Sequence, residues 1–419
     1  MNDLIFLPIL ILLVLLAYTL IPDLFIHRLG IGSWKRHYQP GVALTFDDGP
    51  NPLYTPALLD LLDQYKTKAT FFLVGERAAQ YPELVREIQK RGHQLGVHCQ
   101  VHQHAWLMSP WKTWKVWNEG ISTLEQVTGS PIEYIRPPWG TFNLLTLLWF
   151  KRHKRRAVLW TAEGHDWDIR RTPEQIAQRI LNKIEEGGII VLHDSGGDDG
   201  APEHTLQALR ILLQKIPEVK KLPLLPLSLP EWSGLHRLTY RLWEKWESYY
   251  AHRNRIARIN TTSLFRISKI KYKGPDLIGD DGTVLAHEGD IVGELHLDNT
   301  RLQIKQTDSQ KIGIEALRLA RASLPVLADY IAQSLEYQDI NVFVGLTLLN
   351  RGAKGLGFKV QNVPISPFVR WVGILQKIIM RVYHPQGKTH RMTRLGEPKI
   401  IWISKDALLK RWSSLSSNA

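Results

Sequence analysis

Short apolar segments alternate with amphipathic stretches from residue 42 to residue 192, and this rhythm constrains the fold more than any other feature of the chain. The intervening stretches, such as YTPALLDLLDQY and YPELVREIQKRG, place apolar residues at helical spacing. A chain that repeats strand and helix in this way forms a parallel sheet covered by helices, so the pattern predicts an α/β fold. The expected strands lie at residues 42–46, 69–74, 93–97, 133–136, 157–160 and 188–192.

The chain has 419 residues, which is enough for two domains with buried cores. Its hydrophobic content of 44% and charged content of 22% are ordinary for a globular protein. The single cysteine, Cys99, excludes an intramolecular disulfide framework. Such a chain is compatible with the cytosol and with bacterial envelope proteins that lack disulfides.

The N-terminus carries eighteen consecutive uncharged residues, LIFLPILILLVLLAYTLI, from Leu4 to Ile21. A stretch of this length is near the lower limit for crossing a hydrocarbon core of about 30 Å. A cleaved signal peptide has a basic start and small residues at its cleavage site, and neither MND nor IPDLFIHRLG supplies them. We therefore predict an uncleaved transmembrane anchor over residues 1–26 and a juxtamembrane linker over residues 27–40.

The orientation of this anchor is less constrained by the sequence. Arg28, Lys35 and Arg36 follow the apolar stretch, and the positive-inside rule would keep the rest of the chain in the cytoplasm. Long domains translocate largely regardless of such charges, so both orientations stay open at this point.

Polar residues gather directly after five of the expected strands. In a parallel α/β fold the carboxyl ends of the strands meet on one side, where active sites are built. One such cluster alone would be an ordinary turn or a surface histidine, but five in succession indicate a functional site. The clusters are DDGP at 47–50, HCQVH at 98–102, RPPWG at 136–140, EGHDW at 163–167 and LHD at 192–194.

The motifs TFDDGP, HCQVH, RPPWG, HDW and LHD, in this order and spacing, resemble those of the polysaccharide deacetylases with a NodB-type domain. The resemblance covers residues 41–230 and implies a distorted (β/α) barrel. It also implies a divalent metal, most often zinc and otherwise cobalt, nickel or manganese, that serves in the hydrolysis of N-acetyl groups on amino sugars.

The resemblance also assigns roles to individual residues. It implies that Asp48, His98 and His102 hold the metal, and that Asp47 is the general base, kept in place by Arg136. It implies that His193 is the general acid, tuned by Asp166. The substrate contacts that it implies are Pro138, Trp139, Trp167 and Leu192, the last two lining a pocket for the acetyl methyl group.

Elementary chemistry agrees with these roles. Two neutral imidazoles and one carboxylate leave a divalent metal with net positive charge and free coordination positions. A departing amine must be protonated, which requires an acid on the side of the scissile bond away from the base. The backbone N–H of Trp139 is a candidate second donor to the oxyanion. Non-haem iron oxygenases also use two histidines and a carboxylate, but they need neither the second aspartate nor a distant acid histidine.

Other residues near the histidine motif receive less specific interpretations. Cys99 stands where the resembled family has Ser or Thr, so we expect it to pack the loop rather than bind metal. His104 is expected near the site or at the surface. Trp106, Trp111, Trp114 and Trp117 have a spacing that favours helix packing, although Trp106 is close enough to stack on a sugar.

After residue 230 the pattern changes. Three prolines, at 223, 226 and 230, punctuate residues 220–234, and the last strand of the barrel is expected in LPLLPL. A Trp- and Tyr-rich helical stretch then leads to strand-like segments with DG and EGD turns and to a long helix in IGIEALRLARASLPVLADYIAQSL. We predict a separate, smaller α+β domain over residues 235–419, to which no activity is assigned.

The charge is concentrated at the C-terminus: the last 69 residues carry 13 Lys and Arg against two Asp and Glu. At helical pitch Arg370, Lys377 and Arg381 share one face, and Trp371 and Leu375 point away from them. A basic amphipathic helix of this kind fits either a solvated face or an anionic lipid or wall polymer bound at residues 351–419. Nucleic acid is not expected, because no binding motif is present.

These observations predict a membrane-anchored, metal-dependent deacetylase of a cell-envelope polysaccharide such as peptidoglycan or a chitin-like glycan. We expect a single-pass protein of the cell membrane with its catalytic domain outside the cytoplasm. Two alternatives stay open: deacylation or deformylation of a lipid-linked sugar, and a catalytically idle barrel that binds the wall.

Overall fold

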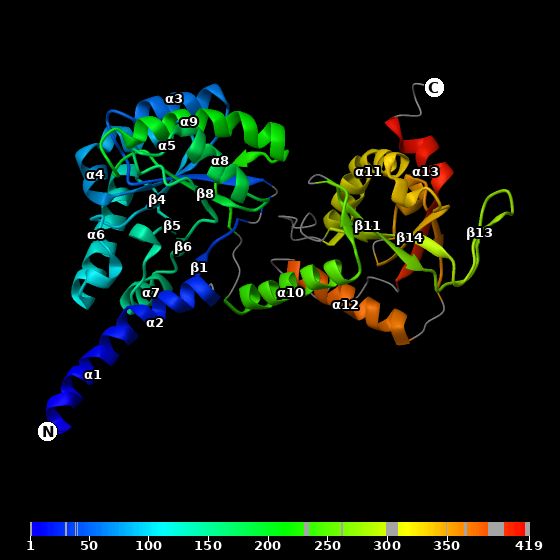
Figure 1. Cartoon of the computed structure of the whole chain (residues 1–419), viewed down its shortest axis with the longest axis horizontal. Coiled ribbons are helices and arrows are strands. Elements are labelled where there is room, and N and C mark those ends of the chain that lie inside the picture. Colours follow the sequence, from blue (N-terminus) through cyan, green and yellow to red (C-terminus); the bar gives the residue numbers. More distant parts are fainter. Residues whose placement is uncertain are drawn as a thin grey trace. The chain divides into compact units, whose positions relative to one another are not determined.

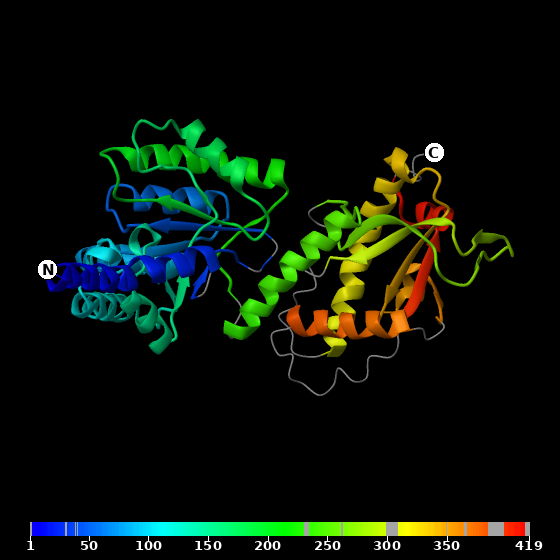
Figure 2. The same cartoon turned by 60° about the horizontal axis from the view of Figure 1, so that its bottom comes forward.

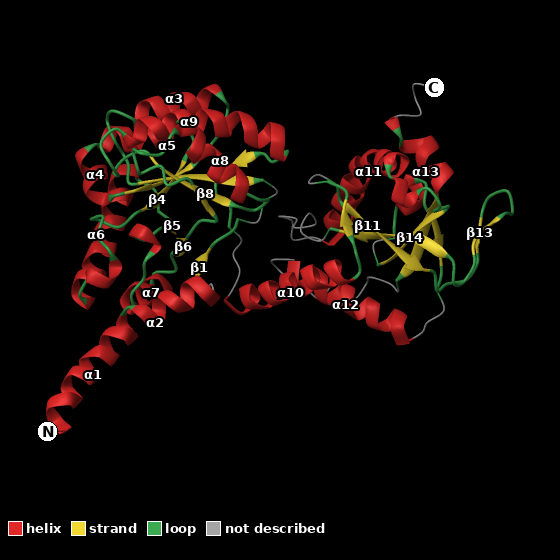
Figure 3. Cartoon of the chain, viewed as in Figure 1, coloured by secondary structure: helices red, strands yellow, loops and turns green. Residues whose placement is uncertain are grey.

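The computed structural model describes two compact units, Met1–Pro230 and Glu231–Ala419, called here the N-terminal and C-terminal units. Each has its own sheet (Figure 3) and its own hydrophobic core. The described residues are 2–29, 32–37, 39, 41–229, 234–260, 263–298, 309–348, 350–363, 367–383 and 398–414.

The N-terminal unit is built on a curled sheet in which every strand pair is parallel. The strand order is β1-β6-β5-β4-β3-β2-β8-β7, and β9 pairs with β2. This confirms the predicted α/β fold of the distorted (β/α) barrel type. The strands are β1 (Ser33–Trp34), β2 (Val42–Asp47), β3 (Thr70–Leu73), β4 (Gln94–Val97), β5 (Tyr134–Ile135), β6 (Arg156–Val158), β7 (Ala162–Glu163), β8 (Ile189–His193) and β9 (Leu224–Leu225).

Helices surround this sheet on its outside (Figures 1 and 2). Their ends follow ordinary capping chemistry: Thr172 and Gln175 form a capping box at the start of α8, and Gly129 ends α6 in the left-handed conformation. The helices are α3 (Thr55–Gln64), α4 (Gly75–Gln80), α5 (Pro82–Lys90), α6 (Pro110–Thr128), α7 (Leu144–Arg152), α8 (Pro173–Lys183) and α9 (Ala201–Lys215).

The tryptophans near the start of α6 do not all pack as their spacing suggests. Trp117 is fully buried and Trp114 packs against the core, as expected for a helix that covers a sheet. Trp111, however, is 87% exposed, and Trp106 is 40% exposed in a short 3-10 turn. Helical spacing identifies residues on one face, but the sheet covers only part of that face.

The N-terminal apolar stretch forms α1 (Asn2–Tyr18) and α2 (Leu20–Leu24), followed by a π-helical turn at Phe25–Leu29. In the described part of the chain, Phe6–Arg28 is the one helix long and apolar enough to cross a membrane. A membrane anchor and a signal sequence both fit this property.

The C-terminal unit is an α+β fold, as predicted. Its main sheet has the order β10-β11-β14-β15-β17-β16, in which only β14 and β15 pair in parallel, and β12 and β13 form a separate hairpin. The strands are β10 (Ala257–Arg258), β11 (Phe265–Lys271), β12 (Leu277–Ile278), β13 (Val284–Ala286), β14 (Ile291–Leu297), β15 (Val342–Thr347), β16 (Lys359–Gln361) and β17 (Lys399–Ser404).

Helices α10 (Gly234–Arg253), α11 (Ser309–Gln333), α12 (Pro367–Tyr383) and α13 (Lys405–Trp412) complete this unit. The helix predicted near the basic tail corresponds to α12. Arg370 is exposed, and Trp371 and Ile374 are 54% and 58% exposed as well. The side chain of Arg381 lies outside the described residues.

Candidate active site

The site begins where β2 ends. Asp47 is the last residue of β2 and is paired in register with His193 of β8. Asp48 follows with a φ of 74°, in the left-handed region, which turns the chain sharply out of the strand. Gly196 packs closely against Asp48, and a larger residue would not fit, because a Cβ there would lie 2.7 Å from Asp48 Oδ2.

Asp48, His98 and His102 form the one group of possible metal ligands among the described residues, with their ligand atoms within 4.8 Å of one another. Asp48 Oδ1 lies 3.3 Å from His98 Nε2 and 3.1 Å from His102 Nε2. This buried oxygen has no hydrogen-bond partner. Because an unsatisfied buried acceptor is costly, the group fits a cation that would satisfy all three atoms.

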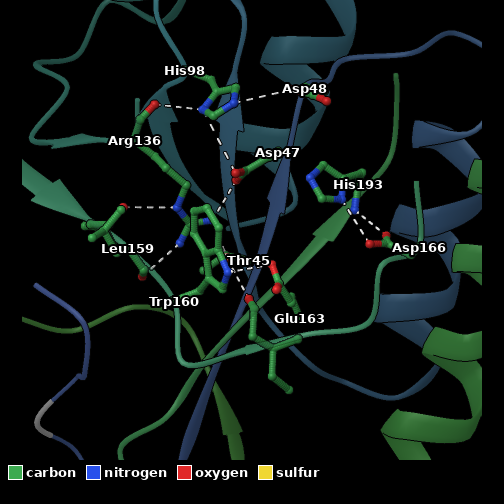
Figure 4. Close-up of polar contacts among 12 residues, drawn as sticks. Thr45, Asp47, Asp48, His98, Arg136, Leu159, Trp160, Glu163, Asp166 and His193 are labelled. Atoms are coloured by element: carbon green, nitrogen blue, oxygen red, sulfur yellow. Dashed lines mark hydrogen bonds and ion pairs between the residues drawn. The ribbon is translucent and has the colours of Figure 1, made fainter. Parts of the chain in front are cut away.

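The protonation of these groups also suits a metal. His98 Nδ1 donates to the backbone carbonyl of Arg136 at 2.7 Å, so Nε2 is the ring nitrogen that faces Asp48 and is available to a metal (Figure 4). Burial alone would raise the pKa of Asp48, but the imidazoles of His102 and His98 hold that pKa well below its usual range. The carboxylate is therefore ionised, as metal binding requires.

Asp47 is held by the buried guanidinium of Arg136, whose Nη1 donates to Asp47 Oδ1 at 2.6 Å (Figure 4). The same Nη1 donates to Thr45 at 2.7 Å, and Nε donates to the carbonyl of Val158 at 3.2 Å. The guanidinium also lies over the ring of Phe72, 4.1 Å from its centre. These contacts fix one oxygen of Asp47, and its Oδ2 lies 4.0 Å from His98 Nδ1.

His193 stands beside this pair at the end of β8. Asp166 Oδ1 lies 3.0 Å from His193 Nδ1, and Asp166 Oδ2 accepts from the backbone N–H of His193 at 2.7 Å (Figure 4). Thr205 donates to the same oxygen at 2.9 Å. Burial disfavours the charged ring, but the charge of Asp166 and its hydrogen bond outweigh burial and raise the pKa of His193 to about 10. The imidazolium can therefore act as a proton donor.

The predicted substrate contacts have unequal exposure. Trp139, with a φ of 53°, is 56% exposed, and its ring lies 4.2 Å from that of His102. Trp167 is 45% exposed, whereas Pro138 is buried and Leu192 is fully buried within the core of the unit. Only the two tryptophans thus present large surfaces to solvent in this structure.

Two residues outside the motifs, His104 and Trp106, extend the ring contacts of Trp139. The ring of His104 lies 5.7 Å from that of Trp139 and 5.4 Å from that of Trp106. His102, Trp139, His104 and Trp106 therefore form a row of rings that leads outward from the candidate metal ligands.

Cys99 contributes no atom to the ligand group. It is fully buried at a φ of 67°, and burial raises the pKa of its thiol to about 12, so the thiol is protonated. Its backbone carbonyl accepts from the N–H of Gly75 at 2.9 Å, which ties the histidine loop to α4.

Sequence reasoning missed three residues that support the site. Arg77 donates to the carbonyl of Asp48 at 2.7 Å and to Ser195, which joins the loops after β2 and β8. Thr205 supports Asp166 from α9. Asp194 is buried with Oδ1 unpartnered, and burial raises its pKa to about 7. Its place in the LHD motif was an available signal, whereas Arg77 and Thr205 lie on amphipathic helices without one.

Comparisons with known proteins agree with this geometry. Residues 35–158 match the polysaccharide deacetylase family, and residues 236–412 match the YkoP domain. A peptidoglycan-N-acetylglucosamine deacetylase of Bacillus cereus is 36% identical over 182 residues, covering 43% of this chain and 82% of that protein. A chitooligosaccharide deacetylase of Azorhizobium caulinodans is 30% identical over 184 residues, covering 42% of this chain and 87% of that protein.

Two further relatives cover similar parts of the chain. A peptidoglycan-N-acetylmuramic acid deacetylase of Bacillus subtilis is 32% identical over 190 residues, covering 44% of this chain and 40% of that protein. The crystal structure of a peptidoglycan N-acetylglucosamine deacetylase superposes with a TM-score of 0.45 and 26% identity, covering 48% of this chain and 93% of that chain. On the extent of these sequence matches, the chain belongs to the polysaccharide deacetylase family.

Proposed function

We propose that the protein hydrolyses N-acetyl groups from the amino sugars of a cell-envelope polysaccharide, peptidoglycan or a chitin-like glycan. The observation that carries this proposal is the unpartnered buried oxygen of Asp48 between two imidazole nitrogens. Asp47 and His193 stand on paired positions of β2 and β8 beside it. The deacetylase names of the curated relatives support the same reaction.

In this proposal Asp48, His98 and His102 hold a divalent metal, with zinc favoured by the nitrogen and oxygen ligands. When bound, the metal polarises the amide carbonyl and lowers the pKa of water. Asp47 removes a proton from the attacking water, and the ion pair with Arg136 keeps its carboxylate in place. The backbone N–H of Trp139 is the proposed donor to the developing oxyanion.

His193 donates a proton to the departing amine, and Asp166 stabilises its imidazolium form. Trp139 and Trp167 offer exposed rings for the sugar and the acetyl group. Leu192 and Pro138 are proposed to shape the pocket from beneath, because both are buried.

Acetate release from peptidoglycan, chitin oligomers and lipid-linked N-acetylglucosamine tests this proposal. We expect release from at least one of these substrates, loss of release after chelation, and recovery with Zn²⁺, Co²⁺, Ni²⁺ or Mn²⁺. Release that survives complete metal removal would contradict the mechanism. Absence of release from every substrate with metal bound would favour the idle wall-binding alternative.

We also propose that the segment up to residue 26 is retained as a single-pass anchor in the cell membrane and that the catalytic unit is extracytoplasmic. The apolar helix at Phe6–Arg28 supports the anchor. The envelope glycans named for the relatives support the orientation. A C-terminal alkaline phosphatase fusion, active only outside the cytoplasm, tests the orientation.

An anionic lipid or wall polymer is the partner that we propose for α12. This helix exposes Arg370 together with Trp371 and Ile374, and a face that combines a cation with apolar side chains suits an anionic interface. Co-sedimentation with anionic vesicles should weaken as salt shortens the Debye length from about 10 Å at 0.1 M to about 3 Å at 1 M. Equal binding to neutral and anionic vesicles would contradict this partner.

A further inference from the structure

The end of the N-terminal apolar helix makes specific polar contacts with the catalytic unit. Asp23 Oδ1 accepts from the backbone N–H of Phe142 at 2.8 Å, and His27 Nε2 donates to the carbonyl of Gly140 at 2.9 Å. Tyr18 donates to the carbonyl of Met108 at 3.0 Å. Ile26 is fully buried. These contacts make residues 18–27 part of the folded unit rather than a tether beside it (Figure 1).

The loops that receive these contacts also shape the active site. Gly140 belongs to the RPPWG motif, and its neighbour Trp139 contacts the candidate ligand His102. Asn143 is fully buried and donates to the carbonyl of Ala105 at 2.8 Å, which joins the segment after this motif to the segment after the HCQVH motif. The helix is therefore connected through one layer of residues to the proposed metal ligands.

The opposite side of the same helical turns is apolar and exposed. A water-soluble domain would not leave such a continuous apolar surface uncovered. The exposed apolar residues continue from the proposed membrane span into the docked turns. The large exposed apolar residues of this series are Phe6, Leu7, Ile9, Leu10, Ile11, Leu12, Leu13, Val14, Leu15, Leu20, Ile21, Leu24 and Phe25. Since the catalytic unit contacts this helix already at Tyr18, a helix anchored in a bilayer would hold the contacting loops at the bilayer surface.

The catalytic unit itself exposes apolar side chains next to the docked helix. Leu107 and Trp111 are 75% and 87% exposed on the segment that receives Tyr18, and Leu144 and Leu148 are 40% and 49% exposed on α7. Helices α1 and α7 are in contact, as are α6 and α7. We call Leu107, Trp111, Leu144 and Leu148 the collar.

Basic residues flank the collar in the sequence. Lys112 and Lys115 follow Trp111 on α6, and Lys151 and Arg152 end α7; all four are exposed. Tryptophan and leucine beside lysine and arginine are the composition of surfaces that insert at the level of lipid headgroups.

We propose that the collar inserts into the interfacial layer of an anionic bilayer and that the docked anchor makes the active site open at the membrane surface. The substrate is then an N-acetylated amino sugar held at that surface by a lipid carrier or on a growing strand. This inference rests on the proposed deacetylase function and specifies that the enzyme binds its substrate at the membrane surface.

Depth-dependent quenching tests the insertion. The full chain is reconstituted into phosphatidylglycerol–phosphatidylethanolamine vesicles that contain nitroxide-labelled lipids, after single substitutions to cysteine and labelling with an environment-sensitive fluorophore. The substitutions are Leu107→Cys, Trp111→Cys, Leu144→Cys and Leu148→Cys. Val219→Cys is the matched control, because Val219 is 67% exposed and apolar on the π-helical turn Ile216–Lys220, outside the docked segments. The native Cys99 is buried, and unsubstituted protein measures its background.

We expect strong quenching by lipids with a shallow nitroxide at the four collar positions and little at position 219. Iodide in the water should quench in the opposite order. Equal quenching at the collar and at position 219 would overturn the proposed insertion. This result is also the one expected if the collar binds a protein instead of lipid.

An activity comparison tests the consequence for the substrate. The quadruple variant Leu107→Gln, Trp111→Gln, Leu144→Gln and Leu148→Gln is compared with Val219→Gln on chitin tetramer in solution and on lipid-linked N-acetylglucosamine in vesicles. Loss of interfacial positioning should lower kcat/KM on the vesicle substrate about tenfold, since the effective concentration of site and substrate falls. Activity on the soluble tetramer should not change, which also reports that the variant is folded.

The two possible failures are distinguishable. If parent protein with metal bound releases acetate from neither substrate, the proposed function fails. If it acts on both and the quadruple variant loses nothing either on vesicles or on peptidoglycan strands in membrane preparations, only the membrane-surface inference fails. A loss on peptidoglycan strands in membrane preparations without a loss on the lipid-linked sugar would assign the growing strand as the source.

Discussion

Two buried carboxylates, one in each unit, differ in the partners that surround them. In the C-terminal unit Asp298 is buried, and Arg266 and Arg258 contact its two oxygens at 2.7 Å and 3.0 Å. In the N-terminal unit Asp48 is buried, yet its Oδ1 has no hydrogen-bond partner and faces two imidazoles. A buried charge with ion-pair partners supports a fold. A buried carboxylate oxygen without a hydrogen-bond partner at the end of a strand instead indicates a binding site for a ligand.

The comparison extends to the rest of each sheet. The N-terminal unit buries Asp47, His98, Arg136 and Asp166 at or beside the carboxyl ends of parallel strands. In the described part of the C-terminal unit the only buried charged side chain is Asp298, and no group of possible metal ligands occurs. The chemistry therefore concentrates in the parallel sheet, whose strand ends all meet on one side.

Substitution of the two adjacent aspartates should produce the largest effects. Asp48→Asn removes a proposed ligand and should abolish both metal content and acetate release. Asp47→Asn should retain metal while turnover falls on the order of 10²–10⁴-fold, because a base is lost and not a ligand. Metal analysis of the purified variants, beside turnover, checks this. An empty site in Asp47→Asn would reverse the two assignments.

Asp166→Asn should have the next largest effect, on the pH dependence. The pKa of His193 is raised to about 10, chiefly by Asp166 against the cost of burial, so the acid form is lost only as pH rises through that value. A cation held by Asp48, His98 and His102 would lower this limit in the parent enzyme. Without Asp166 the alkaline limb of kcat should move about 1–3 pH units further down. A pH–rate profile measures the shift, and an unchanged alkaline limb would exclude His193 as the acid that Asp166 tunes.

Asp298→Asn should affect stability rather than chemistry. It leaves two arginines beside an uncharged amide, and loss of one partner of a buried ion pair costs about 3–5 kcal/mol. The C-terminal unit should therefore unfold at lower denaturant, while acetate release from a soluble oligomer stays constant. The exposed Asp339→Asn serves as the control. A loss of activity at unchanged stability would give the C-terminal unit a part in catalysis.

Cys99→Ser should have the smallest effect. The thiol is buried and protonated and lies outside the ligand group, so metal content and turnover should stay within a few-fold. Slow labelling of Cys99 by thiol reagents in the native protein checks its burial independently. Rapid labelling, or a variant without metal, would make Cys99 part of the site.

Much of the N-terminal unit was predictable from the sequence. The six expected segments coincide with β2, β3, β4, β5, β6 and β8, because buried strands are apolar throughout and are separated by helices with regular spacing. The short strands β1 and β7 were not predicted, since neither lies in a longer apolar segment. Asp48, His98 and His102 were expected to come together, and the structure does place them together.

Periodicity was less informative where it had to decide which face of a helix is covered. The spacing of Trp111 favoured helix packing, yet Trp111 is exposed; the spacing of Trp371 placed it away from the basic residues, and it is exposed as well. A repeat of 3.6 residues groups side chains on one face of a helix, but it does not say whether a neighbouring element covers that face.

The sequence by itself determined the alternating elements, the apolar N-terminal helix and the polar residues at the strand ends, because these depend on local spacing and on the order of parallel strands. Only the tertiary structure decided that Asp48 Oδ1 lacks a hydrogen-bond partner, that Arg77 joins two loops, and that Asp23 and His27 dock the N-terminal apolar helix beside the RPPWG motif. Each of these depends on contacts between residues far apart in the chain, and such contacts leave no local pattern in the residues that make them.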